Sequence, residues 1–142
     1  MRALGVDFGE VRIGLAISDE TGTLASPLET IRRRRGKRPP LNRIEAVARE
    51  HGAEALVVGL PLELSGEESD WSREVRAVAD SLERRLHLPV HLFDERMSSV
   101  QAERAVRSSG LPRGKREEKD RVDSAAAAII LQGWLDRRGS AS

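Results

Sequence analysis

The sequence contains no cysteine, and aromatic residues make up only 3% of it. Without cysteine there are no disulfides, thiolate nucleophiles or sulfur-ligated zinc or iron sites. Two Trp, two Phe and no Tyr are too few for a sheet surface on which RNA bases stack in a row. His51, His87 and His91 are scattered, and no two of them lie four residues apart within one expected helix. A metal site would therefore use carboxylate oxygens, which favour Mg²⁺ or Mn²⁺.

The chain also lacks any apolar run near the roughly 20 residues that cross a bilayer. Asp7 comes too early for a signal peptide, so we expect a cytoplasmic protein without membrane association. No internal repeat or Pro/Ser-rich linker divides the 142 residues, a length typical of one domain. We expect a single domain over residues 1–137 and a short frayed tail at 138–142.

The formal net charge of +1 hides an uneven distribution of charge. Positive charges without any acid are concentrated at Arg32, Arg33, Arg34, Arg35, Lys37 and Arg38. A second basic run contains Arg113, Lys115, Arg116 and Lys119. Such a patch is typical of a surface that binds a phosphate backbone, and equally of a charged loop that only interacts with water.

Residue patterns predict three consecutive strands, at 3–7, 12–18 and 24–31, joined by short turns as an antiparallel meander. Pro27 favours an edge position for the third strand, because proline has no N–H to donate. Helical and strand periods then alternate. We expect a helix from Pro39-Pro40 to Gly52, a strand at 55–59, a helix at 71–86, a strand at 90–93, a helix after a capping box of Ser98 and Gln101, a polar loop at 110–120, and a buried helix from Asp123 to about residue 137.

This order, β-β-β-α-β-α-β-α, predicts an α/β domain with a five-stranded mixed sheet and helices on both faces. Trp71 and Trp134 fall on apolar helix faces and are expected to be core residues.

Acidic residues lie where these elements begin or end, which is where catalytic groups of α/β sheets collect. Asp7 ends the first strand, Asp94 and Glu95 follow the fifth, and Asp123 opens the last helix. Each acid also has an ordinary structural explanation: an Asx turn, a surface pair with Arg96, or an N-cap. Spacing alone does not show that these positions meet.

Four sequence blocks, in a fixed order, resemble the YqgF/RuvX family, described as pre-16S rRNA nucleases and formerly as Holliday junction resolvases. The blocks are residues 5–19, beginning Gly5-Val6-Asp7-Phe8-Gly9, together with 57–62, 93–99 and 122–127, and they bracket residues 4–132. Two departures are mild. Ser98-Ser99 stand where the family often has Thr-Thr, and Ser65-Gly66 where it often has Asp-Gly.

The resemblance implies a ribonuclease H-like fold in which Asp7, Glu95 and Asp123 converge on one or two Mg²⁺ or Mn²⁺ ions. Such ions activate water and stabilise the leaving oxygen in phosphodiester hydrolysis. Asp94 is the reserve ligand, because a slip of one residue exchanges which neighbour of the Asp94-Glu95 pair points inward.

The resemblance also suggests residues that contact nucleic acid. Gly9, without a side chain, would let the nucleic-acid backbone approach the metal. Arg12 and Arg96 would contact phosphate or orient a carboxylate. The basic runs would bind backbone nonspecifically, with affinity that falls as salt rises; their residues are Arg32, Arg33, Arg34, Arg35, Lys37, Arg38, Arg113, Lys115, Arg116 and Lys119.

The favoured function is a metal-dependent nuclease that processes the 5′ end of precursor 16S rRNA, a monomer acting on pre-rRNA or pre-ribosomal particles. A resolvase of four-way DNA shares the metal chemistry but requires a two-fold dimer. An actin- or sugar-kinase-like nucleotide-binding module fits the opening segment, although 142 residues supply only one of the two domains that such proteins close around ATP. A non-catalytic RNA-binding assembly factor is the third alternative.

Overall fold

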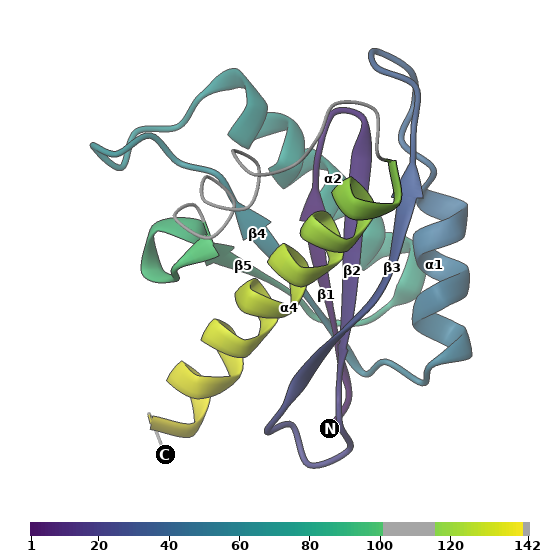
Figure 1. The fold of residues 1–142 in the computed structure, drawn as a ribbon, viewed down its shortest axis with the longest axis vertical. Coiled ribbons are helices and arrows are strands. Elements are labelled where there is room, and N and C mark those ends of the chain that lie inside the picture. Colours follow the sequence, from purple (N-terminus) through teal and green to yellow (C-terminus); the bar gives the residue numbers. More distant parts are fainter. Residues whose placement is uncertain (101–115, 141–142) are drawn as a thin grey trace.

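The computed structural model describes residues 1–100 and 116–140, with side chains at 1–100 and 122–138. Its elements follow the predicted order (Figure 1). They are β1 (Ala3–Phe8), β2 (Arg12–Ser18), β3 (Ala25–Arg32), α1 (Leu41–Glu50), β4 (Ala55–Leu60), α2 (Asp70–Leu86), β5 (Val90–Asp94), the 3-10 turn η1 (Glu95–Met97) and α4 (Arg116–Ser140). The helix expected after Ser98 and Gln101 falls largely outside the described residues.

The five strands form one mixed sheet in the order β3-β2-β1-β4-β5. The first three strands pair antiparallel, and β4 and β5 extend the sheet in parallel from β1. The predicted meander and the predicted edge position of Pro27 in β3 are therefore confirmed. Proline is tolerated there because an edge strand has one side without ladder hydrogen bonds.

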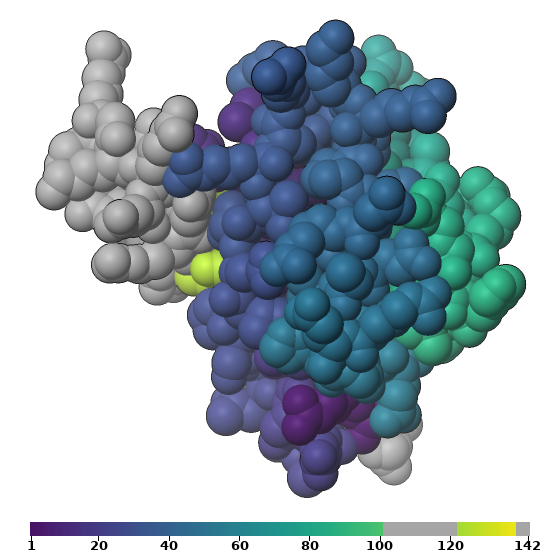
Figure 2. All heavy atoms as spheres, turned by 90° about the vertical axis from the view of Figure 1, so that its right-hand side faces the viewer, coloured from purple at the N-terminus to yellow at the C-terminus, as the bar shows by residue number. Residues whose placement is uncertain are grey.

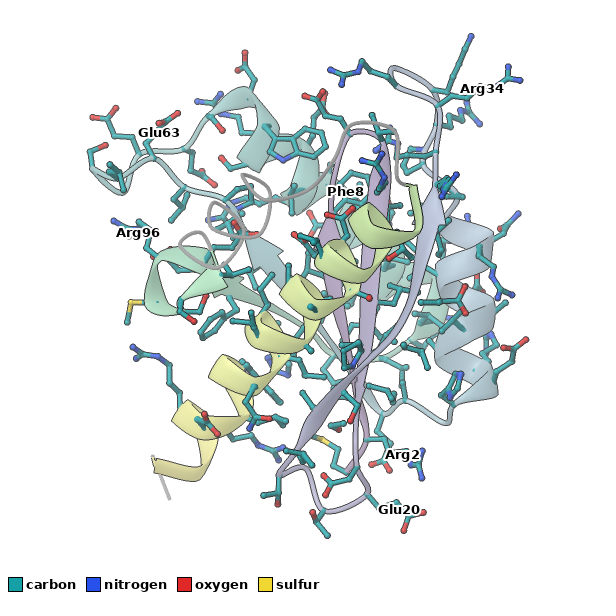
Figure 3. The ribbon with its side chains drawn as sticks, viewed as in Figure 1. Arg2, Phe8, Glu20, Arg34, Glu63 and Arg96 are labelled. Atoms are coloured by element: carbon teal, nitrogen blue, oxygen red, sulfur yellow. The ribbon has the colours of Figure 1, made fainter. Side chains whose placement is uncertain are left out.

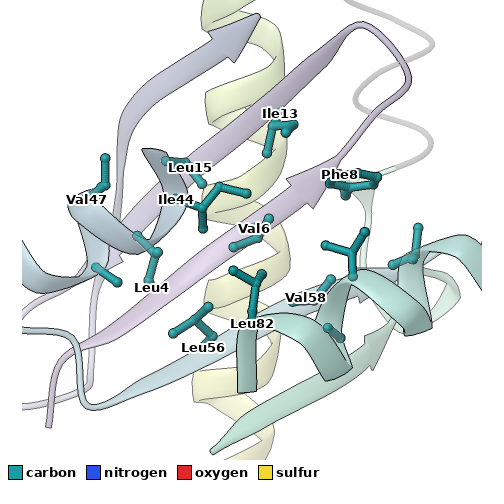
Figure 4. Close-up of a cluster of buried hydrophobic side chains, with 14 of the residues drawn as sticks. Leu4, Val6, Phe8, Ile13, Leu15, Ile44, Val47, Leu56, Val58 and Leu82 are labelled. Carbon is teal, nitrogen blue, oxygen red and sulfur yellow. The ribbon is translucent and has the colours of Figure 1, made fainter. Parts of the chain in front are cut away.

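Alternation along β1 gives the sheet two different faces. Leu4, Val6 and Phe8 join the cluster that α1 and α2 cover, part of which is drawn in Figure 4. Ala3 belongs to the opposite cluster, beneath α4, which crosses the front of the sheet in Figure 1. Burying one large aliphatic side chain stabilises a fold by about 1.5–3 kcal/mol. Because buried aliphatic side chains lie on both faces of the sheet, both faces stabilise the fold. The expected helices on both faces are confirmed.

The last helix is longer than the sequence pattern indicates. It begins at Arg116, so Asp123 lies about two turns inside the helix, and the expected N-cap role of Asp123 is wrong. The polar composition of residues 116–120 predicts a loop, but arginine, glutamate and lysine are good helix formers even without an apolar stripe. The helix continues through residues 138–140, which were expected in the frayed tail. None of the helices in the described part of the chain is long and apolar enough to cross a membrane.

Candidate active site

The carboxyl ends of the parallel strands β1, β4 and β5 meet at one edge of the sheet. Ligands of open α/β sheets bind in the crevice outside these ends. Asp7 is the last residue but one of β1, Asp94 ends β5, and Glu95 begins η1. The strand order therefore brings the first acid and the Asp94-Glu95 pair to the same edge.

Asp7 has a glycine beside it on each neighbouring strand. On β2 its register partner is Gly14. On β4 the neighbouring position is Gly59, which follows Val58, the partner of Val6. Adjacent strands lie only about 4.8 Å apart. Because neither glycine has a side chain, other groups can approach the sheet on both sides of Asp7.

The other two acids approach the sheet at these glycines. A Cβ built on Gly14 would lie 2.1 Å from the carbonyl oxygen of Asp123 in α4. A Cβ built on Gly59 would lie 2.9 Å from Oε1 of Glu95. Asp123 and Glu95 therefore flank Asp7 on the face of the sheet that α4 covers, although the three residues are far apart in the sequence.

The three acids are shielded from solvent to different degrees. Glu95 is only 3% exposed and Asp7 8%, whereas the side chain of Asp123 is 22% exposed, with Nε of Arg12 3.9 Å from its Oδ2. Burying ionised carboxylates close together is unfavourable unless hydrogen bonds or cations compensate. The site therefore combines concentrated negative charge with restricted access to water.

The residues fit a divalent metal in donor chemistry, and the fold brings them to one end of the sheet. Carboxylate oxygens are hard ligands of the kind that Mg²⁺ and Mn²⁺ prefer, and the two glycines remove the Cβ atoms that would separate Asp7 from its neighbours. Among the described side chains, no three carboxylate or imidazole groups are already grouped as metal ligands. The three acids therefore lie in the same region of the fold, but their carboxylates are not arranged as a metal-coordination shell among the described residues.

Asp94, the reserve ligand, is engaged with Arg96. Its carboxylate accepts hydrogen bonds from Nη2 of Arg96 at 2.7 Å and from the backbone N–H of Arg96 at 2.9 Å. The hydrogen bonds from the Arg96 side chain are the main reason that the pKa of Asp94 lies below its ordinary value. Nη1 of Arg96 also donates to the carbonyl of Leu64 at 3.2 Å. In this arrangement Arg96 orients Asp94 and holds the loop after β4, while Glu95 points to Gly59.

Gly9 is explained by the hairpin that joins β1 and β2. Its N–H donates to the carbonyl of Arg12 at 2.9 Å, and a Cβ on Gly9 would lie 2.4 Å from that carbonyl oxygen. The turn thus gives Gly9 a structural reason, and its expected role in letting the nucleic-acid backbone approach the metal stays a prediction.

The basic segment 32–38 follows β3 and projects at the top of the molecule, in blue in Figure 2. Arg34, Lys37 and Arg38 are exposed, and Arg34 points away from the fold in Figure 3. Arg35 pairs with Glu10 at 2.6 Å. Arg32 is also exposed, at the end of β3, and Arg33 packs inward as described below. Of the second basic run, Arg113 and Lys115 lie outside the described residues, and Arg116 and Lys119 fall in α4 where side chains are not described.

The structure reveals two site features that the sequence reasoning missed. The glycines Gly14 and Gly59 determine how closely Asp123 and Glu95 approach Asp7. A glycine inside a strand pattern is a known signal of close approach by another group, and both positions carried that signal. The second feature, a cavity beside Phe8, had no signal in the sequence, because its walls come from separate segments.

This chain is similar to several known proteins. A family model described as "RuvX: Holliday junction resolvase" matches residues 1–137. Proteins named "Putative pre-16S rRNA nuclease" from Anaeromyxobacter sp. (strain K) and Maridesulfovibrio salexigens are 49% and 43% identical to this chain. These matches cover 97% and 96% of this chain and 98% and 99% of the relatives.

Among solved structures, "T. thermophilus RuvC in complex with Holliday junction substrate" matches with a TM-score of 0.56 at 18% identity. The match covers 98% of this chain and 96% of that chain. At this level of identity the likeness concerns the fold alone, and it confirms the expected ribonuclease H-like architecture.

Proposed function

The chain belongs to the RuvX family, and on this premise we propose that it is a divalent-metal-dependent nuclease acting on structured nucleic acid. The favoured substrate is the 5′ end of precursor 16S rRNA, because relatives that align over nearly the whole chain carry the name of a pre-16S rRNA nuclease. The observation that carries the proposal is the position of Asp7 between two glycines at which Asp123 and Glu95 approach the sheet.

Asp7, Glu95 and Asp123 would hold Mg²⁺ or Mn²⁺, which when bound supplies an activated water and stabilises the leaving oxygen of the phosphodiester. Asp7 lies between the other two acids, so it would contribute to the site on both sides. Glu95 is almost fully buried, which would restrict the motion of its carboxylate. Arg12, near Asp123, would orient that carboxylate and neutralise charge on an incoming phosphate.

Substrate binding would involve the exposed cations of segment 32–38. Arg34, Lys37 and Arg38 extend from the same end of the sheet as Asp7, because the segment follows β3, whose last residue pairs with Arg12. Such cations bind the phosphate backbone of a nucleic acid independently of its base sequence, and their contribution to affinity weakens as the salt concentration rises. A monomer in the cytoplasm, acting on pre-rRNA or pre-ribosomal particles, remains our prediction.

The description of the matched family supports a second candidate, resolution of four-way DNA. The metal chemistry would be the same, but a symmetric junction requires two active sites related by a two-fold axis. A dimer that forms on junction DNA would favour this candidate. The family match favours both nuclease functions over a kinase-like nucleotide-binding module.

The test is cleavage of a pre-16S-like RNA and of a four-way DNA junction, with Mg²⁺ or Mn²⁺ present. We expect the wild type to cut the RNA and the Asp7→Asn variant to bind it without cutting. Asp80→Asn is the matched control, because Asp80 is exposed on α2, away from the site. Cleavage retained by Asp7→Asn would contradict the assigned role of Asp7. RNA binding without any cleavage by the wild type would favour the non-catalytic assembly factor.

A further inference from the structure

Beside Phe8, the end of β1 borders a cavity of about 440 Å³. Its lining comes from the loop after β3, which provides Arg33, Arg35 and Lys37, and from α2, which provides Trp71. The volume is within the range of cavities that bind small organic ligands, about 300–1,000 Å³. The cavity lies on the face opposite the acids, because Asp7 and Phe8 are successive residues of a strand and point to opposite faces.

Three of the groups that line the cavity are flat and stack on one another. The rings of Phe8 and Trp71 are 5.6 Å apart between centroids and inclined by only 19°. The guanidinium carbon of Arg33 lies 4.9 Å from the centroid of Phe8. Trp71 remains partly exposed, although it packs against the core as expected. Aromatic and guanidinium planes are the surfaces on which unpaired nucleobases stack.

The rim provides charges that suit a phosphate. Lys37 is exposed, and Arg35 is exposed next to its partner Glu10. Nη2 of Arg33 donates to the carbonyl of Lys37 at 2.7 Å, whereas Nε of Arg33 is buried without a hydrogen-bond partner among the described residues. A buried donor without an acceptor is unfavourable, so Arg33 retains unused hydrogen-bonding capacity beside the cavity. Glu74 adds a carboxylate acceptor.

We propose that this cavity binds one unpaired nucleotide of the nucleic-acid substrate, with the base against Trp71 and the phosphate towards Lys37 and Arg35. This assignment rests on the nuclease function proposed above. Since Phe8 directly follows Asp7, a strand that crosses this end of the sheet presents one phosphate to the acids and a neighbouring nucleotide to the cavity. The enzyme consequently prefers substrates with an unpaired nucleotide close to the cleaved bond.

Fluorescence of Trp71 provides a direct test. The chain contains two Trp, so the Trp134→Phe variant leaves Trp71 as the only one. We expect saturable quenching of this variant by a short single-stranded RNA and no quenching by a blunt duplex. In the reverse variant, Trp71→Phe, the remaining Trp134 reports from the other face of the sheet and its emission should not change. Absence of quenching by the single strand would overturn the proposal.

Titration with adenosine 5′-monophosphate shows whether the cavity binds a nucleotide within an RNA chain or a free mononucleotide. We expect it to quench Trp71 only at concentrations well above those of the RNA, because it lacks the contacts of the neighbouring nucleotides. Tighter binding of the monophosphate than of the RNA would contradict the assignment to substrate and indicate a free nucleotide as the ligand.

A charge variant tests the phosphate contact independently of fluorescence. Lys37→Gln should weaken binding of single-stranded RNA by about 10-fold, as expected for the loss of a charge-assisted hydrogen bond. Arg84→Gln removes the same charge from the far end of α2 and is the matched control. Equal effects of the two variants would contradict a phosphate contact in the cavity.

These binding measurements do not depend on cleavage. Repeated with the Asp7→Asn substitution added, they should give the same quenching. If the wild type fails to cleave RNA but Trp71 is still quenched, the cavity is a nucleotide site and the nuclease function is wrong. If cleavage is found without quenching, only the cavity assignment fails. Thermal melting confirms that each variant is folded.

Discussion

Gly59 lies directly beneath the carboxylate of Glu95, so that a Cβ on Gly59 would be 2.9 Å from Oε1 of Glu95. The same Cβ would be 2.7 Å from Cδ1 of Ile130 in α4. The orientation of Glu95 therefore depends on a residue of β4 that has no side chain. Because Gly59 is also the strand neighbour of Asp7, one glycine determines how close two acids of the candidate site can come.

We predict that Gly59→Ala displaces Glu95 and lowers cleavage by at least about 10-fold, similar to the loss of a group that orients a metal ligand. It should also reduce the free energy of unfolding by about 1–3 kcal/mol through overpacking. Steady-state cleavage and chemical denaturation measure the two effects.

The control for Gly59→Ala is Gly5→Ala. A Cβ on Gly5 would lie 2.8 Å from Cβ of Leu131 and 3.0 Å from the carbonyl oxygen of Ala127, so this variant also overpacks α4, but against residues that are not acidic. It should be destabilised to a similar degree and remain active below its melting temperature. Equal loss of cleavage in both variants would mean that Glu95 is not the cause.

The Asp94–Arg96 pair should make stability depend on pH. Hydrogen bonds from Arg96 lower the pKa of Asp94 below its ordinary value of 3.8. The pair therefore stabilises the folded state above that value, and this contribution is lost as the pH falls through the lowered pKa. At pH 7 the melting temperature of Asp94→Asn should thus be lower than that of the wild type. This difference in melting temperature should become smaller below about pH 4.

Melting curves of wild type, Asp94→Asn and the control Asp80→Asn, recorded at pH 7 and pH 3, check this dependence. The expected contribution of the pair is at most about 1 kcal/mol, because it is partly exposed to solvent. A difference between wild type and Asp94→Asn that is the same at both pH values would show that the charge of Asp94 does not matter.

Much of the fold follows from local sequence patterns. The apolar runs of β1 and β4 and the helical stripe of α2 predict elements within a residue or two of their observed bounds. In each of them the apolar residues that define the pattern are the residues that the fold buries. The start of α4 does not follow. The segment before Asp123 is helical although it is polar, so it carries no apolar stripe that would indicate a helix. In the sequence alone, an aspartate inside a helix cannot be told from an aspartate at the N-cap.

The candidate site depends on information that no single segment contains. The resemblance suggested Asp7, Glu95 and Asp123, but spacing could not show that they lie together. Their proximity results from the order β2-β1-β4-β5 and from the glycines beside Asp7. Likewise, the choice between Asp94 and Glu95 depends on the turn η1, where Asp94 accepts a hydrogen bond from the N–H of Arg96 and Glu95 points inward.

Nucleic-acid binding should depend on the exposed cations of segment 32–38. Combined substitution of Arg34→Gln and Arg38→Gln removes two charges that project into solvent. The slope of log affinity against log salt should then fall by about 1.8 for duplex DNA and about 1.4 for a single strand. Filter binding or anisotropy at several salt concentrations measures the slope.

Arg84→Gln combined with Arg137→Gln removes the same charge from exposed helix positions elsewhere, and should leave the slope nearly unchanged. If the Arg34 and Arg38 substitutions do not change the slope, the basic segment is a solvated loop without a role in binding.

The central claim is that Asp7, Glu95 and Asp123 together bind a divalent metal ion. Anomalous diffraction from crystals grown with Mn²⁺ tests it most directly. The account predicts a manganese peak at the carboxyl end of β1, coordinated by Asp7 and by Glu95, Asp123 or both, and absent from crystals of Asp7→Asn. Manganese bound only elsewhere, with these acids unchanged in saturating metal, would contradict it.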